Sequence, residues 1–420
     1  SFHLIPLLLR LMSRTEEQPR WWRMLGPGFI VAATGVGAGD LIAAAVAGQR
    51  FGLAVLWVVL LGALFKAVLN EGVSRWQLAT GTTLMEGWIR HLPRWVSWYF
   101  LVYLCFWGFL VAAALISACG VAAHALFPVL PVPAWGALHT LAGAVLVWTG
   151  GYKTFENIMK GLIAAMFAVV IICAAWIGAP VGEFFGGLFI PSMPEGSSRL
   201  LLGVMGGVGG SATLLCYGYW IREKGWCGKE MHRRTWMDLC SAYVLTGLFG
   251  IALIVIAAGV EPADASGQAL ILALSERLGD LLGPIGKIAF LIGFWCSVFS
   301  SLLGVWQGVP YLFSEYVYQI GKKEITPPPS RSRSYRAFLL FLAIPPLALL
   351  FFQRPIAIVI LYAVAGAFFM PFLASLLLIM NNRESWVGEM KNGIITNIAL
   401  VCSLILFGLL FGFEIAQRFF

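Results

Sequence analysis

Long uninterrupted apolar segments constrain the possible folds of this chain more than any other feature. Only 11% of the 420 residues are charged and 60% are hydrophobic, whereas about 25% charge is usual in a soluble domain. Apart from the eighth, which is longer, each apolar segment is near the roughly 20 residues that a helix needs to cross a bilayer. We predict about eleven spans, with approximate limits at 25–49, 52–79, 97–126, 132–150, 155–179, 197–221, 236–259, 283–318, 336–352, 355–381 and 393–416.

The spans are expected to be helices and not strands. Backbone groups in lipid must find partners within their own segment or within a closed barrel. Barrel strands are alternating segments of about ten residues, whereas the apolar runs here are longer and continuous. The expected fold class is therefore all-α, a polytopic membrane protein.

The basic residues predict the orientation of the chain. If segment 1–24 is cytosolic, most Lys and Arg lie in segments on that side, as the positive-inside rule requires. The opposite segments and span ends hold only Arg50, Arg199, Arg277, Lys287, Arg354 and Arg418. This bias explains the net charge of +8 without a nucleic acid partner. We expect a protein of the plasma (inner) membrane with a cytoplasmic N-terminus and an external C-terminus.

Two spans are interrupted by glycine-rich runs, at 35–40 in the first span and at 206–211 in the sixth. We call them the first break and the second break. A glycine in a helix interior is unfavourable by about 1 kcal/mol, so dense runs at mid-membrane favour unwound backbone. Their matching depth, five spans apart, is typical of an inverted repeat with one broken helix in each half. The alternative is that both runs are close-packing faces of intact helices.

Unwound backbone at the breaks is the expected substrate site. Free carbonyl groups attract cations, and helix N-termini attract anions. Asp40 is ionisable at mid-membrane and hence a functional candidate; the alternative is that it only caps the restarting helix. Ser211 and Thr213 offer hydroxyl oxygens, or alternatively cap a helix locally. The candidate substrate-binding residues are Gly37, Ala38, Gly39, Asp40, Gly207, Gly210, Ser211 and Thr213.

The other charges near the spans are expected to be structural or solvated. Acidic and basic residues four apart can pair on one helix face. The sequence holds two such pairs, Glu71 with Arg75 and Glu156 with Lys160. Lys66 is a further deep charge of the second span, and Glu315 is expected to be solvated near a span end. No Walker loop, dinucleotide fingerprint, HExxH or nucleophile elbow occurs, so neither an enzyme nor a resident cofactor is expected.

Several short motifs carry a family resemblance. They are LGPGF at 25–29, FGLAVLWVV at 51–59, ATG at 79–81, MPF at 370–372, NNR at 381–383 and MKN at 390–392. Together they resemble the NRAMP (natural resistance-associated macrophage protein) family of divalent-metal transporters. The resemblance implies a leucine-transporter-like core at 25–382, built from inverted repeats at about 25–179 and 197–381. An extra helix would follow in 383–420.

The resemblance also implies secondary-active transport of a divalent metal cation by alternating access, but the expected site departs from the family. The family has Asp-Pro-Gly-Asn at the first break, where this chain has GAGD at 37–40. At the second break the family has Ala-x-x-Met-Pro-His, where this chain has Gly207, Gly210, Ser211 and Ala212. Loss of the soft Met ligand favours a hard ion such as Mg²⁺ or Mn²⁺.

Such an ion would be held by Asp40 and by the carbonyls of Gly37 and Gly207. One alternative is a carrier of the same fold for a small organic solute, such as an amino acid or carboxylate, because glycine breaks expose helix N-termini to anions. Another is a membrane sensor or scaffold that has lost transport. Nothing in the sequence indicates the oligomeric state.

Overall fold

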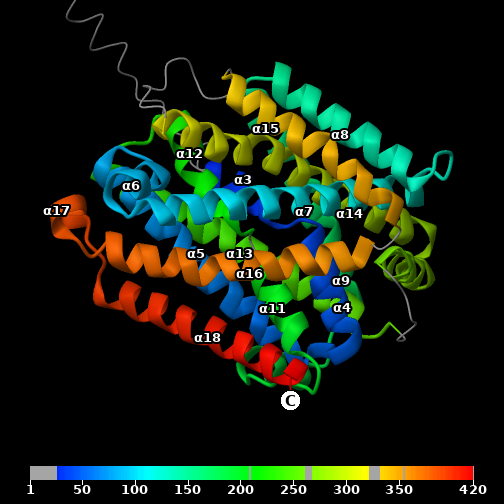
Figure 1. Ribbon diagram of the computed structural model, residues 1–420. Helices are drawn as coiled ribbons and strands as arrows, with labels where there is room; N and C mark the ends of the chain where they lie inside the picture. Colours follow the sequence, from blue (N-terminus) through cyan, green and yellow to red (C-terminus); the bar gives the residue numbers. More distant parts are fainter. Residues whose placement is uncertain (1–25, 208–209, 261–266, 321–331, 353–354, 420) are drawn as a thin grey trace, which may run out of the picture.

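The computed structural model describes residues 26–207, 210–260, 267–320, 332–352 and 355–419 (Figure 1). Within these residues every regular element is helical, which confirms the predicted all-α fold class. The long helices are α5 (Leu56–Thr80), α7 (Arg94–Leu126), α8 (Val132–Thr149), α9 (Tyr152–Ile177), α13 (His232–Ala257), α14 (Gly267–Ile320), α16 (Pro355–Met380) and α18 (Ile394–Phe419). The shorter ones are α3 (Pro27–Gly35), α4 (Ala38–Phe51), α6 (Leu84–His91), α10 (Val181–Phe189), α11 (Ser198–Gly207), α12 (Cys216–Glu223), α15 (Arg333–Ala343) and α17 (Glu384–Val387).

The described residues contain eight helical segments that are long and apolar enough to cross a membrane, or nine if the bent pair Glu384–Met390 and Ile394–Leu409 is one span. With the bent pair counted as one span, the difference between these nine and the predicted eleven arises at two places. The first predicted span is divided at the first break, and its second part continues into α5 as Leu41–Thr80. The tenth is represented by Phe368–Met380, which is counted as a shorter apolar helix.

Glycines of positive φ end helices inside the two longest segments. Gly52 (φ +60°) ends α4, and the 3₁₀ turn η1 (Gly52–Val55) leads into α5. Gly283 (φ +72°), followed by Pro284, interrupts α14. Left-handed backbone is strained for residues with a Cβ, and proline lacks the amide of a helical hydrogen bond. These turns therefore divide segments that would otherwise be single helices.

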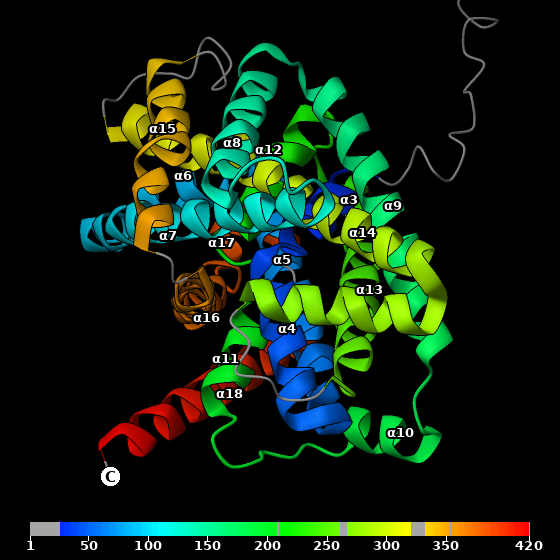
Figure 2. The same ribbon diagram turned by 90° about the vertical axis from the view of Figure 1, so that its right-hand side faces the viewer.

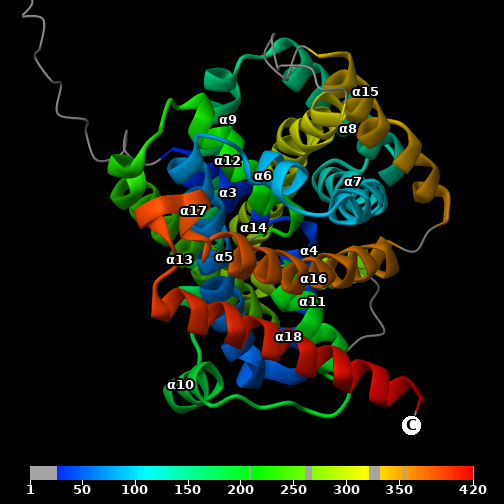
Figure 3. The ribbon, with the colours of Figure 1, turned by 60° about the vertical axis from the view of Figure 1, so that its left-hand side comes forward.

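The two broken helices lie at the centre of the bundle. In the segment Leu200–Glu223, 94% of the most apolar stretch is buried inside the protein, whereas in Val132–Thr149 of α8 only 22% of the corresponding stretch is buried. Helix α13 packs against α3, α4 and α5, while α14 packs against α3 and α7 (Figure 2). Helix α18 runs along α16 at the outside and also contacts α11 (Figure 3). This arrangement surrounds both breaks with protein.

Candidate functional site

The structure confirms that both glycine runs interrupt helices. Helix α3 ends at Gly35 and α4 begins at Ala38. Helix α11 ends at Gly207. The next helical element is the 3₁₀ turn η2 (Ala212–Leu215), which leads into α12. A Cβ built on Gly210 would lie 3.6 Å from the Cα of Gly35, so the two breaks touch.

Three serines of α14 face the end of α3 at the first break. Positions 297, 300 and 301 share one face of α14, because residues three and four apart are neighbours on a helix. Their hydroxyls donate to carbonyl oxygens of the first broken helix: Ser297 to Val36 (2.5 Å), Ser300 to Ala33 (3.1 Å) and Ser301 to Thr34 (2.6 Å). Neutral donors therefore satisfy the carbonyls that a helix end leaves free. These serines were not predicted from the sequence.

A charged group reaches the second break. Lys66 lies in the middle of α5 and is only 1% exposed. Its Nζ donates to the carbonyl oxygen of Gly206 at 2.8 Å and makes a closer contact with that of Gly210. From the sequence, Lys66 was predicted as a deep charge but not as part of the site. A lysine inside a long apolar helix is itself the signal, because such a charge is rarely kept without a partner or a function.

The predicted site residues that the structure describes are all at the breaks. Gly37 is buried, and its carbonyl accepts from the amide of Leu41 at 3.0 Å. The carbonyl of Gly207 accepts from the amide of Gly210 at 2.9 Å. Both carbonyls therefore have one backbone partner, and a carbonyl oxygen has two lone pairs.

The hydroxyl-bearing candidates Ser211 and Thr213 are buried, at 3% and 6% exposure. The backbone of Asp40 belongs to the first turn of α4. The side chains of Ala38 and Asp40 lie outside the described set, so the predicted role of Asp40 stays a prediction.

Helix α16 packs closely against the second break. A Cβ built on Gly366 would lie 2.9 Å from Ser211 Oγ and 3.4 Å from the carbonyl oxygen of Gly206. Only a residue without a side chain allows this approach. Sequence reasoning did not find Gly366, because an isolated glycine in an apolar span is common in membrane helices.

A buried carboxylate holds the start of the first broken helix. Asp238 of α13 accepts hydrogen bonds from the amides of Gly26 (3.2 Å) and Gly28 (2.6 Å), and from the hydroxyl of Tyr217 (3.0 Å). The first amides of a helix have no partners within it, and a negative charge there is favourable. Asp238 therefore ties α3 to α13 and α12.

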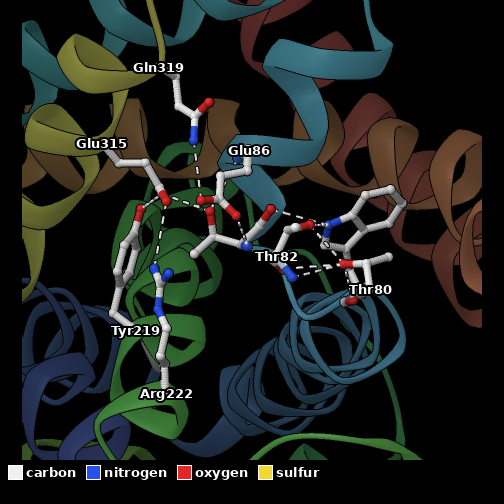
Figure 4. A network of polar contacts seen from close by, with 9 residues as sticks. Thr80, Thr82, Glu86, Tyr219, Arg222, Glu315 and Gln319 are labelled. Carbon is white, nitrogen blue, oxygen red and sulfur yellow. Dashed lines mark hydrogen bonds and ion pairs between the residues drawn. The ribbon is translucent and has the colours of Figure 1, made fainter. Parts of the chain in front are cut away.

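A second buried carboxylate holds the helix that follows the second break. Glu315 of α14 accepts from the hydroxyl of Thr83 at 2.7 Å and from Tyr219 of α12 (Figure 4). Arg222 of α12 lies 3.6 Å from its other oxygen. The expectation that Glu315 is solvated is wrong: it is 0% exposed, because α6 and α12 both cover this part of α14.

A capping box positions Thr83 for this contact. The hydroxyl of Thr83 accepts from the amide of Glu86, whose carboxylate accepts from the amide of Thr83. Gln319 donates to the other oxygen of Glu86 at 3.2 Å (Figure 4).

Both ion pairs predicted from the sequence are present in the structure: Glu71 with Arg75 at 2.8 Å, and Glu156 with Lys160 at 2.7 Å. Glu156 additionally pairs with Lys224, at 2.7 Å.

The described side chains indicate which kinds of ligand atom the two breaks offer. Among the described side chains, no group of three or more His, Cys, Asp or Glu is placed to hold a metal ion. The oxygens that the described part of the chain offers at the breaks are carbonyls and hydroxyls. Such oxygens suit hard cations better than soft ones.

One protein family matches most of this chain. The family described as "Natural resistance-associated macrophage protein-like" matches residues 28–415. The chain is 25% identical over 289 residues to the divalent metal cation transporter MntH of Klebsiella pneumoniae, covering 62% of this chain and 66% of that protein. It spans 36% to 66% of the length of four curated relatives that it matches.

Two solved structures share the fold. A mutant of the Eremococcus coleocola manganese transporter matches with a TM-score of 0.76 and 16% identity, covering 94% of this chain and 87% of that one. MhsT in complex with L-phenylalanine matches with a TM-score of 0.64 and 18% identity, covering 91% and 97%. The fold is therefore similar to that of leucine-transporter-type carriers, as the resemblance implied.

Proposed function

The chain belongs to the natural resistance-associated macrophage protein-like family, and from that premise we propose that it carries a divalent metal cation across a membrane by alternating access. One observation supports this most directly: two broken helices meet at their unwound segments in the buried centre of the bundle. Backbone carbonyls at such a meeting point are the groups with which carriers hold cations.

The proposed ligands are the Asp40 carboxylate and the carbonyls of Gly37 and Gly207, with Gly210, Ser211 and Thr213 lining the site. Ala38 and Gly39 complete the first break. Carboxylate and carbonyl oxygens suit Mg²⁺ or Mn²⁺, so we propose a hard divalent ion as the substrate. In alternating access the half-helices α3 and α12 would pivot about the ends far from the breaks, because a buried carboxylate holds each of them there.

The membrane arrangement proposed with this function has eleven passages. The break divides the first passage into α3 and α4, and α16 supplies the tenth. Inverted repeats at about 25–179 and 197–381 would rock against each other within the core 25–382, with 383–420 as an added helix. The basic residues favour a cytoplasmic N-terminus and an external C-terminus in the plasma (inner) membrane.

Ion uptake into proteoliposomes tests the proposal. Saturable uptake of Mg²⁺ or Mn²⁺ is expected for the parent protein, with Ca²⁺ compared in parallel, and Asp40→Ala should abolish it. Asp280→Ala is the matched control, because Asp280 is an exposed aspartate of α14. If protein shown to be folded takes up none of the ions, the divalent-cation proposal fails.

A second candidate is transport of a small organic solute, and one cavity favours it. This cavity has a volume of about 490 Å³ and is lined by Glu223, Gln307, Tyr311, Tyr335 and Arg336, among others. Its volume lies within the range of small-molecule sites, about 300–1,000 Å³, and far exceeds a bare ion. Uptake of a labelled amino acid or carboxylate that Arg336→Ala abolishes would favour this candidate.

A further inference from the structure

The carbonyls that Lys66 contacts are those that the second break sets free. In a continuous helix the carbonyl of Gly206 would accept from the amide of Gly210, four residues on. In the structure that amide instead donates to the carbonyl of Gly207. The end of α11 also carries the negative pole of the helix dipole. The second break therefore presents oxygens that attract a cation, and the Lys66 ammonium lies on two of them.

Lys66 supplies a cation from within the protein. Its side chain is almost completely buried, and an ammonium has three N–H donors and no acceptor. Lysine is rarely buried so completely unless its charge is compensated. The first break differs, because the carbonyls of Ala33, Thr34 and Val36 accept from neutral serine hydroxyls.

We propose that Lys66 is a tethered cation on the carbonyls of Gly206 and Gly210, beside the Gly207 carbonyl proposed as a metal ligand, so that it competes with the transported ion. The inference rests on the proposed function. A divalent ion coordinated by the Gly206 or Gly210 carbonyl would lie beside the ammonium, and like charges in a buried site repel strongly. Entry of the ion therefore requires the ammonium to leave these carbonyls, and its return helps to expel the ion.

Binding of Mn²⁺ alone to purified protein, followed by electron paramagnetic resonance of free Mn²⁺, tests this inference. Lys66→Gln removes the charge and keeps N–H donors, and it should raise Mn²⁺ affinity by about tenfold or more. Lys66→Met should do the same if it folds, and Lys66→Arg, which keeps the charge, should not. Lys160→Met is the control, since Lys160 is a partly exposed member of an ion pair on α9. Size-exclusion profiles and thermal unfolding would check the fold of each variant.

Addition of methylammonium to Lys66→Ala gives a second measurement. If the ammonium itself competes with the metal, the free cation should lower the Mn²⁺ affinity of this variant and leave that of the parent protein unchanged. A role limited to packing predicts no such effect.

The outcomes separate this inference from the proposed function. Uptake by the parent protein, with unchanged or weaker Mn²⁺ binding by folded Lys66→Gln, overturns the inference and leaves the proposed function standing. Mn²⁺ binding by Lys66→Gln alone supports the inference, while the parent protein would then fail as a carrier of this ion. No Mn²⁺ binding by any folded variant overturns the inference, and the proposed function fails with it only if the parent protein also takes up none of the ions in proteoliposomes.

Discussion

The two broken helices have the same plan but different chemistry. Each has a half-helix held by one buried carboxylate, α3 by Asp238 and α12 by Glu315. At the first break, three carbonyls accept from neutral hydroxyls of α14. At the second break, carbonyls are satisfied by the ammonium of Lys66.

The two carboxylates that hold the half-helices, here called the anchors, also differ in the groups that they bind. Asp238 binds backbone amides of α3, whereas Glu315 binds side chains of α12. The first anchor therefore holds the backbone of its half-helix directly, whereas the second holds its half-helix only through side chains, which have rotatable bonds of their own. We expect the first broken helix to be the more rigid of the two, while the second break holds a buried charge, the Lys66 ammonium.

Removal of the two anchors should have the largest effect. Asp238→Ala leaves three buried donors without an acceptor, which should lower the free energy of unfolding by about 3 kcal/mol. Glu315→Ala should cost about 2 kcal/mol, because its partner Arg222 is partly exposed and solvent screens that charge. Thermal unfolding in detergent measures both, with Glu384→Ala as the control, an exposed carboxylate paired with Lys391. Equal losses at the two anchors would remove the proposed difference in rigidity.

Adding a methyl group at each break should have an intermediate effect. Gly37→Ala would bring a Cβ to 2.8 Å from Ser301 Cβ. A side-chain rotation does not move that atom, so overpacking of about 2 kcal/mol is expected. Gly210→Ala meets only the rotatable hydroxyl of Thr213 but keeps φ at +83°, which costs about 1 kcal/mol. Thermal unfolding with the parent protein as reference orders the two, and a larger loss at Gly210 would contradict the contacts.

Removal of a single hydroxyl at the first break should have the smallest effect. Ser301→Ala leaves the carbonyl of Thr34 without its donor, which should lower the free energy of unfolding by about 1 kcal/mol. Because this hydroxyl is neutral, the change in Mn²⁺ affinity should be far smaller than that caused by Lys66→Gln. A comparable change in affinity for both variants would end the contrast between a neutral and a charged break.

The sequence predicted the features that depend on residues close together in the chain. Glycine density located both breaks, because the helix penalty of glycine depends on the residue alone. The spacing of four predicted the pair of Glu71 and Arg75 for a similar reason, since both partners lie on one helix. The solvation of Glu315 was predicted wrongly, because its distance from a span end says nothing about which helices cover it.

By itself, the sequence determined that the chain is all-α, apolar along most of its length and interrupted at 35–40 and 206–211. Composition and local backbone preference are sufficient for these conclusions, because lipid requires each segment to satisfy its own backbone. Only the tertiary structure decided which groups satisfy the interrupted backbone. Lys66 lies 140 residues before Gly206 and Ser301 lies 267 residues after Thr34, and such pairings depend on how separate helices pack against one another.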